Sequence, residues 1–173
     1  MSTINYDLTK IKAFIFDVDG VLSPDSIPLS DTGVPMRMVN IKDGFAINQA
    51  IKHGYGVAII TGGDAESVYM RFAKLGVKHI YMKSRIKIND FNDYIEKTGY
   101  KSEEIIYVGD DLPDMPVMKE VGLPVAPADA APEIKAIAKY ISHCNGGMGV
   151  GRDVIEQVMK TQGKWGNEEA FGW

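Results

Sequence analysis

Short apolar runs alternate with longer amphipathic stretches along most of the chain. The three clearest runs lie at residues 13–16, 57–60 and 105–108. They are rich in β-branched or aromatic residues, and a continuous apolar run of about four residues is typical of a strand buried on both faces. Weaker strand patterns lie at residues 80–81, 123–126 and 140–141. The pattern therefore predicts up to six short strands.

Amphipathic stretches with helical spacing separate these runs. They cover residues 44–53, 65–75, 88–97 and 150–159. A glycine follows several helical stretches, as C-terminal caps do, at Gly54, Gly76, Gly99 and Gly122. Strands and helices that alternate at this spacing predict an α/β fold with three layers, in which a parallel, Rossmann-like sheet carries helices on both faces.

Two segments break the alternation. Residues 23–40 contain three prolines and the turn signal Asp31-Thr32-Gly33, which predicts a β-hairpin projecting from the sheet. Residues 161–173 contain three glycines and two tryptophans without periodicity, which predicts a mobile tail. The whole chain, residues 1–173, is interpreted as a single domain that includes both segments.

Composition narrows the possible classes of protein. The chain has 173 residues, of which 45% are hydrophobic and 24% are charged, so it is an ordinary globular domain rather than a disordered chain or a coiled coil. No apolar run approaches the roughly 18 residues of a transmembrane helix. The formal net charge of −4 gives no sign of the basic face that a general nucleic-acid binder needs.

Cysteine usage and the N-terminus bear on the cellular compartment. The single cysteine, Cys144, excludes an intramolecular disulfide. The first ten residues lack the charged and then apolar layout of a signal peptide. Both observations favour a reducing cytoplasm.

Acidic residues follow the strong strands. Asp-Val-Asp-Gly follows the first strand at residues 17–20, Thr-Gly-Gly-Asp follows the second at 61–64, and Gly-Asp-Asp-Leu-Pro-Asp follows the strand at 105–108. In open α/β sheets, ligands bind outside the carboxyl ends of the strands. Converging carboxylates repel one another, and a Mg²⁺ ion with oxygen ligands relieves the repulsion. An isolated aspartate at such a place is usually a turn former or helix cap, but three strand ends together favour a metal site.

These motifs resemble the four signatures of the haloacid dehalogenase superfamily of phosphohydrolases. Residues 16–22, Phe-Asp-Val-Asp-Gly-Val-Leu, look like the first signature, and Thr61 looks like the second. Lys87, which precedes a helical stretch, resembles the third, with Lys83 and Arg85 as alternatives. Residues 109–114 resemble the fourth. The ordered set is specific, whereas a lone Asp-x-Asp-x-Gly motif would be weak.

The resemblance implies a role for each residue. Asp17 would attack phosphorus as a nucleophile, and Asp19 would protonate the leaving group and then activate water. Thr61, Gly62 and Lys87 would bind the phosphoryl group. The implied Mg²⁺ ligands are Asp17, the backbone carbonyl of Asp19, and Asp110. Asp111 and Asp114 would be alternative ligands or would hold the ligands in place.

The spacing of the motifs leaves no room for an inserted cap domain between them. Several segments resemble the 3-deoxy-D-manno-octulosonate 8-phosphate phosphatases: residues 39–44, the helix end at Leu75-Gly76, residues 109–112 with 116–118, and residues 146–149 followed by Arg152. This resemblance implies a small sugar acid phosphate as substrate, with Lys42, Asp43 and Gly44 among the substrate-binding residues. It also implies a homotetramer in which the hairpin and the tail help to cover a neighbour's site.

Two departures keep the substrate open. The family often has arginine where this chain has Lys42, and often has arginine where it has Gly63. Arginine and lysine are not equivalent for bidentate carboxylate binding. The alternatives are therefore a phosphatase of a nine-carbon sialic-type acid 9-phosphate, a non-catalytic oligomerisation domain of this fold, and a polynucleotide end phosphatase, which the acidic charge disfavours.

Overall fold

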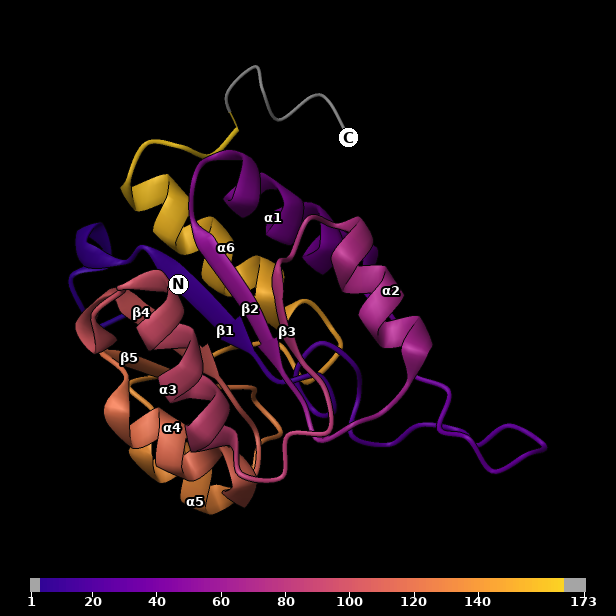
Figure 1. Cartoon of the computed structure of the whole chain (residues 1–173). Coiled ribbons are helices and arrows are strands. Elements are labelled where there is room, and N and C mark those ends of the chain that lie inside the picture. The colour runs from indigo at the N-terminus through magenta and orange to yellow at the C-terminus, as the bar shows by residue number, and fades with distance from the viewer. Residues whose placement is uncertain (1–3, 167–173) are drawn as a thin grey trace.

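The computed structural model describes residues 4–166, which form a central β-sheet with helices packed on both faces (Figure 1). Six parallel strands form the sheet in the order β3-β2-β1-β4-β5-β6. The strands are β1 (Ala13–Phe16), β2 (Gly56–Ile60), β3 (His79–Tyr81), β4 (Ile105–Val108), β5 (Leu123–Ala126) and β6 (Tyr140–Ile141). All six predicted strands are confirmed, with bounds that differ by at most one residue.

Helices cover both faces of the sheet, as the alternation predicts (Figure 1). The α-helices are α1 (Ile41–Lys52), α2 (Glu66–Lys74), α3 (Lys87–Thr98), α4 (Met115–Glu120), α5 (Pro132–Ile137) and α6 (Val150–Thr161), with short 3-10 turns at η1 (Leu8–Lys10), η2 (Ser102–Glu104) and η3 (Leu112–Asp114). The sequence patterns did not reveal α4 and α5. Each has six residues, which is too short for a helical period to repeat.

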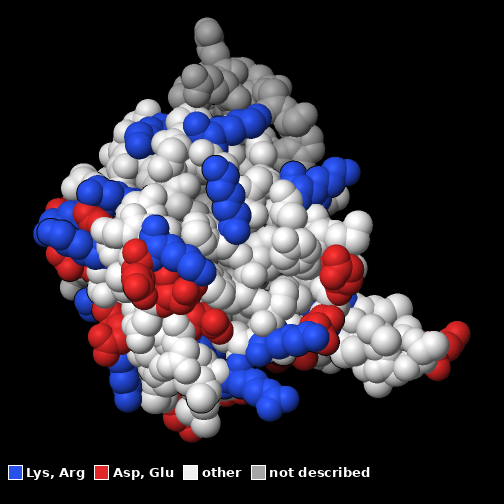
Figure 2. All heavy atoms as spheres, in the orientation of Figure 1, with Lys and Arg blue, Asp and Glu red and all other residues white. Residues whose placement is uncertain are grey.

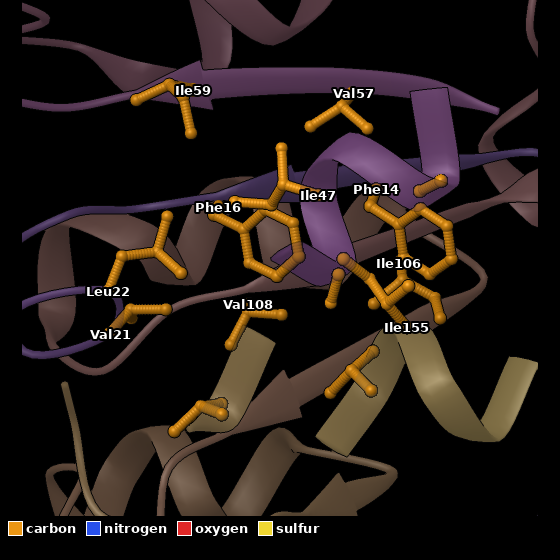
Figure 3. Close-up of a cluster of buried hydrophobic side chains, with 14 of the residues drawn as sticks. Phe14, Phe16, Val21, Leu22, Ile47, Val57, Ile59, Ile106, Val108 and Ile155 are labelled. Carbon is orange, nitrogen blue, oxygen red and sulfur yellow. The ribbon is translucent and has the colours of Figure 1, made fainter. Parts of the chain in front are cut away.

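Successive residues of the central strand pack into opposite layers. Phe14 and Phe16 of β1 belong to the core that α1, α2 and α6 cover (Figure 3), whereas Ile15 belongs to the core beneath α3, α4 and α5. All three side chains are fully buried. This alternation explains why the strand is apolar at every position. The three-layer α/β fold is therefore confirmed.

Residues 23–40, called here the projecting segment, extend away from the body of the protein (Figure 1). The amide of Met36 donates to the carbonyl of Pro28 at 2.9 Å, and Ser30 donates to Val34 at 2.9 Å. One antiparallel bridge joins Leu29 and Pro35. The predicted hairpin is present as a turn with a single bridge, because prolines limit the ladder of backbone hydrogen bonds.

The predicted tail begins later than residue 161. Thr161 is the last residue of α6, and the Trp165 ring packs edge-on against Phe45 with 6.1 Å between ring centres. Residues 161–165 thus include the end of a helix and an aromatic contact, and the mobility of this segment stays a prediction. Its remaining part, residues 167–173, lies outside the described residues.

The surface carries mixed charge. Figure 2 shows lysine and arginine side chains interspersed with acidic ones on this face, while the projecting segment is largely uncharged there. Over residues 4–166, the helices are too short or too polar for any of them to cross a membrane.

Candidate active site

Strand register brings the acidic motifs to one edge of the sheet. Phe16, the last residue of β1, lies beside Ile59 of β2 and Val108 of β4. Asp17 continues this pairing, because its amide donates to the carbonyl of Val108 at 3.1 Å. The residues that follow β1, β2 and β4 therefore meet at the carboxyl edge of the sheet, where α/β proteins bind ligands.

A buried lysine joins two of the acidic side chains. Lys87, the first residue of α3, places Nζ 2.7 Å from Oδ2 of Asp17 and 2.7 Å from Oδ1 of Asp114. Only 5% of the lysine side chain is exposed. We call Asp17, Lys87, Asp110 and Asp114 the strand-end cluster. The structure thus brings Lys87, rather than Lys83 or Arg85, to the nucleophile that the resemblance implies.

Both carboxylate oxygens of Asp114 accept hydrogen bonds from other groups of the protein. Oδ1 accepts from Tyr107 at 2.6 Å as well as from Lys87, and Oδ2 accepts from the amides of Asp110 at 3.1 Å and Asp111 at 3.3 Å. A carboxylate with this many donors holds its neighbours in place and has little capacity left for a metal ion. Asp111 is exposed and caps η3 by accepting from the amide of Leu112 at 2.8 Å.

Burial and like charge dominate the electrostatics of the cluster. Burial and the neighbouring Asp114 raise the pKa of Asp17, while Lys87 opposes that rise. Burial acts to lower the pKa of Lys87, but Asp17 and Asp114 outweigh it and raise that pKa. Desolvation, with Asp114 and Asp17, raises the pKa of Asp110 to about 8. The site therefore holds more negative charge than one lysine neutralises.

The excess charge fits a bound cation. Asp17, Asp110 and Asp114 each offer an oxygen, and these oxygens lie within 4.8 Å of one another. Among the described residues, none donates a hydrogen bond to the Asp110 carboxylate, whereas Asp114 is saturated. Oxygen ligands suit Mg²⁺, and an ion here would stabilise the ionised form of Asp110. Asp17 and Asp110 are thus the side chains best placed to hold it.

Thr61 and Gly62 follow β2 at the same edge. Thr61 is buried, and its Oγ1 accepts from the amide of Gly63 at 3.1 Å. The backbone of Thr61 is fixed by bonds to Tyr81 at 3.0 Å and Ser84 at 2.9 Å. The amide of Gly62 has no acceptor within the described part of the chain, so it can donate to an anion.

Asp19 does not join the strand-end cluster through its side chain. Its two carboxylate oxygens accept from Nε and Nη2 of Arg37, both at 2.8 Å. Arg37 lies 18 residues further along the chain, in the projecting segment. Sequence analysis missed it because nothing in the motif spacing marks this arginine.

Comparison with known proteins identifies the family. A sequence model of the haloacid dehalogenase-like hydrolases matches residues 79–153. The chain is 43% identical over 154 residues to the 3-deoxy-D-manno-octulosonate 8-phosphate phosphatase KdsC of Salmonella typhi, which covers 89% of this chain and 82% of that protein. The chain belongs to this phosphatase family. The resemblance expected from the ordered motifs is therefore confirmed.

Solved structures of the family share the fold. The 3-deoxy-D-manno-octulosonate 8-phosphate phosphatase of Yersinia pestis superimposes with a TM-score of 0.89 at 35% identity, covering 92% of this chain and 86% of that one. The enzyme of Moraxella catarrhalis, in a complex with a magnesium ion, a phosphate ion and KDO, gives a TM-score of 0.86 at 31% identity, with 95% and 92% covered. The described part of this chain is a parallel sheet with helices on both faces and has no inserted cap domain.

The three remaining predicted substrate residues lie at the start of α1, away from the ion pairs of the cluster. The Asn40 side chain caps this helix by accepting from the amides of Lys42 at 2.9 Å and Asp43 at 3.2 Å. Lys42 is exposed and lines a broad surface groove with Arg152. The structure does not bring Lys42 to the strand-end cluster, and its predicted role is untested.

Asp43 and Gly44 line a different, smaller cavity. It has a volume of about 80 Å³ and reaches Val18 and Arg37, so it lies beside the first motif. Asp43 is buried, and its Oδ1 accepts from the amide of Arg152 at 2.6 Å. Burial raises the pKa of Asp43 to about 6, against the opposing effect of Arg152. The Arg71 guanidinium packs directly against Gly44, because a Cβ at this position would lie 2.4 Å from Nη2 of Arg71.

Two glycines that sequence analysis did not assign to the site shape it. A Cβ at Gly20, where φ is +81°, would lie 2.0 Å from Oδ2 of Asp110. A Cβ at Gly146 would lie 2.2 Å from the carbonyl oxygen of Gly20. Gly146, in the loop before α6, thus packs against the backbone of Gly20, and Gly20 packs against the carboxylate of Asp110. The motif pattern hinted at Gly20, but nothing local pairs it with Gly146.

Proposed function

We propose that this chain is a Mg²⁺-dependent phosphatase that hydrolyses 3-deoxy-D-manno-octulosonate 8-phosphate to the free sugar acid and phosphate. The observation that supports this best is the strand-end cluster, in which Lys87 contacts Asp17 beside the Asp110 carboxylate, which accepts no hydrogen bond from residues 4–166. The 43% identity to a phosphatase named for that substrate supports the choice of sugar acid.

Asp17 is the proposed nucleophile. Its carboxylate attacks phosphorus, the bond from phosphorus to the ester oxygen breaks, and an aspartyl-phosphate forms. Lys87 holds Oδ2 at 2.7 Å and the amide of Val18 donates to Oδ1 at 2.6 Å, so the side chain is fixed for attack before substrate arrives. Fixed orientation of this kind contributes much of the acceleration in phosphoryl transfer.

Asp19 moves the proton in both steps. In the first, its carboxyl proton passes to the ester oxygen as the sugar leaves. In the second, the Asp19 carboxylate takes a proton from water while the water oxygen attacks phosphorus and the bond to Asp17 breaks. Phosphate is then released, and Asp17 and Asp19 return to their starting states.

Phosphoryl oxygens gain charge stabilisation from Lys87, the Thr61 hydroxyl and the free amide of Gly62. Mg²⁺ would be held by Asp17 and Asp110, with the backbone carbonyl of Asp19 as a further ligand, and would neutralise charge on the transferring group. Asp114 holds Lys87 and the backbone of Asp110 and Asp111 in place.

The sugar acid itself is assigned to the region around the cavity at the start of α1. Asp43 and Gly44 line this cavity, while Lys42 faces the neighbouring groove. The competing substrate is a nine-carbon sialic-type acid 9-phosphate, since Lys42 and Gly63 replace arginines that are frequent in the family.

Assembly as a homotetramer is part of the proposal. The projecting segment exposes large apolar side chains, among them Leu29, Val34, Met36, Met38 and Val39. Exposed apolar side chains gathered in this way mark an interaction surface. The proposed location is the cytoplasm, in agreement with the single cysteine. A monodisperse, fully active monomer in light scattering would contradict the assembly.

The function is tested by comparing kcat/KM for the eight-carbon and nine-carbon acid phosphates. We expect the eight-carbon ester to be preferred, phosphate release to stop in EDTA and return with Mg²⁺, and Asp17→Asn to lower the rate by about 10⁴-fold or more. Equal or reversed preference would refute the substrate. Inactivity of the folded wild-type protein on a panel of phosphate esters would instead favour a non-catalytic role.

A further inference from the structure

An arginine of the projecting segment, Arg37, pairs with Asp19 of the first motif. Nε donates to Oδ1 and Nη2 donates to Oδ2, both at 2.8 Å. Two parallel bonds between planar groups fix orientation as well as distance. Only 12% of the Arg37 side chain is exposed, whereas 40% of the Asp19 side chain is exposed.

The backbone of the projecting segment aims this arginine inward. Met36 and Met38, the neighbours of Arg37, are 48% and 53% exposed. Arg37 lies between these two exposed methionines, yet only 12% of its side chain is exposed, so it is turned toward the protein. The amide of Met38 also donates to Oγ of Ser23 at 3.2 Å, which ties this stretch to the residues after the first motif.

The same guanidinium lies against the loop that follows β2. A Cβ on Gly63 would come within 3.0 Å of Nη2 of Arg37 and 3.4 Å of Oγ1 of Thr61. The lack of a side chain at position 63 leaves this space to Arg37. One cation therefore contacts both the proposed proton donor and the proposed phosphate-binding loop.

We propose that Arg37 is a positioning residue, which holds Asp19 in the orientation that proton transfer to the leaving oxygen requires. This inference rests on the proposed function. A general acid must lie within hydrogen-bond reach of the oxygen that it protonates. Arg37 restricts the otherwise half-exposed Asp19 carboxyl, and both oxygens accept from it in this structure. When Asp19 carries its proton, one oxygen gives up its bond to Arg37 and directs the proton to the ester oxygen, while the other keeps its bond to the guanidinium.

The leaving group separates this role from others. An alkyl phosphate such as the sugar acid phosphate releases a strongly basic alkoxide that needs a proton, whereas 4-nitrophenyl phosphate releases a weakly basic phenolate that does not. The value of kcat/KM reports the steps up to release of the alcohol, so it isolates the proton donation by Asp19. Loss of the donor's orientation should therefore affect only the alkyl ester.

The experiment measures kcat/KM for both esters in the wild-type protein, Arg37→Met, Arg37→Lys, Asp19→Asn and the Asp19→Asn/Arg37→Met double variant. We expect Arg37→Met to lower the value for the alkyl ester by about 10²-fold and for the nitrophenyl ester by less than about 3-fold. Arg37→Lys should recover part of the loss, because lysine offers a single contact. The double variant should be no slower than Asp19→Asn on the alkyl ester.

Three outcomes would overturn the inference: equal losses on both esters, additive losses in the double variant, or no loss in Arg37→Met. The ratio of the two kcat/KM values does not depend on how much of a variant is folded, so partial unfolding cannot imitate the expected result. Failure of the proposed function is recognised separately, because it would appear as inactivity of the wild-type protein on the sugar acid phosphate. Any alkyl phosphate that the wild-type protein hydrolyses can serve in the test.

Discussion

The strand-end cluster and the projecting segment hold the two aspartates of the first motif in different ways. Asp17 continues the register of β1 and contacts a lysine from the start of a covering helix. Asp19, two residues later, is held by an arginine from a segment with a single antiparallel bridge. The proposed nucleophile is thus positioned by the core of the fold, and the proposed acid by a peripheral element.

This difference predicts how substitutions in each region behave. In the cluster, buried charges are paired with one another, so removal of one leaves others unpaired and affects stability together with activity. In the projecting segment, backbone contacts are few and many side chains are exposed, so substitutions should affect stability less than in the cluster, while activity depends on Arg37.

Lys87→Met tests the cluster and should have the largest effect. The variant leaves Asp17 and Asp114 buried without their cation, so we expect a loss of about 3–5 kcal/mol in the free energy of unfolding. We also expect kcat/KM to fall by about 10²–10³-fold, because a donor to the transferring group is lost. Chemical denaturation and steady-state phosphate release measure the two effects.

Lys97→Met is the matched control, because Lys97 lies on the same helix and pairs with Asp93 at 2.7 Å with both side chains well exposed. Its denaturation midpoint and activity should stay close to those of the wild-type protein. Equal stability losses in the two variants would show that burial of Lys87 does not distinguish the cluster.

The sequence predicted the cluster better than the projecting segment for a physical reason. Asp17, Thr61 and Asp110 each follow an apolar strand, and parallel strands place their carboxyl ends together, so local pattern was enough. Two other contacts join residues that are far apart in the chain: Asp19 pairs with Arg37, and Gly146 packs against Gly20. Such contacts depend on how a loop crosses the sheet edge, which no local period encodes.

Short or aperiodic elements were missed on the same grounds. The six-residue helices α4 and α5 hold too few turns for an amphipathic pattern. The contact between Trp165, which follows α6, and Phe45 of α1 also corresponds to no pattern in the sequence. A side chain that packs through one aromatic contact leaves no repeating signal in the sequence.

Asp43→Asn tests the start of α1, where Asp43 lines the cavity that also reaches Val18 of the first motif and Arg37 of the projecting segment. Burial raises the pKa of Asp43 to about 6 from its ordinary value of 3.8, so the folded state binds this proton more tightly than the unfolded state does. The contribution of Asp43 to the stability of the wild-type protein should therefore fall as pH rises from about 4 to about 6. The loss amounts to at most about 3 kcal/mol, since one pKa unit corresponds to about 1.4 kcal/mol.

Asparagine removes this titration and can still accept from the amide of Arg152. We expect Asp43→Asn to be more stable than the wild-type protein at pH 7.5 and the difference to shrink toward pH 4.5, in thermal unfolding followed at both values. A difference that is constant with pH would contradict the assignment to Asp43. If Asp43 also binds the sugar acid, as proposed, the variant should raise KM while kcat changes less.

The smallest expected effects come from two glycine substitutions that compare the regions directly. Gly146→Ala places a methyl group against the carbonyl of Gly20, and the Cα of Gly20 packs on Asp110. We therefore expect a loss of about 1–3 kcal/mol in the free energy of unfolding, together with weaker activation by Mg²⁺.

The matched control, Gly33→Ala, lies in the projecting segment with open space around it, although φ there is +76°. Backbone strain should cost about 1–2 kcal/mol and remain local, so Mg²⁺ titration of activity should match that of the wild-type protein. If Gly33→Ala shifted the Mg²⁺ dependence as much as Gly146→Ala does, the turn of the projecting segment and the strand-end cluster would be energetically coupled. Asp17 and Asp19 would then not be positioned by two independent parts of the protein.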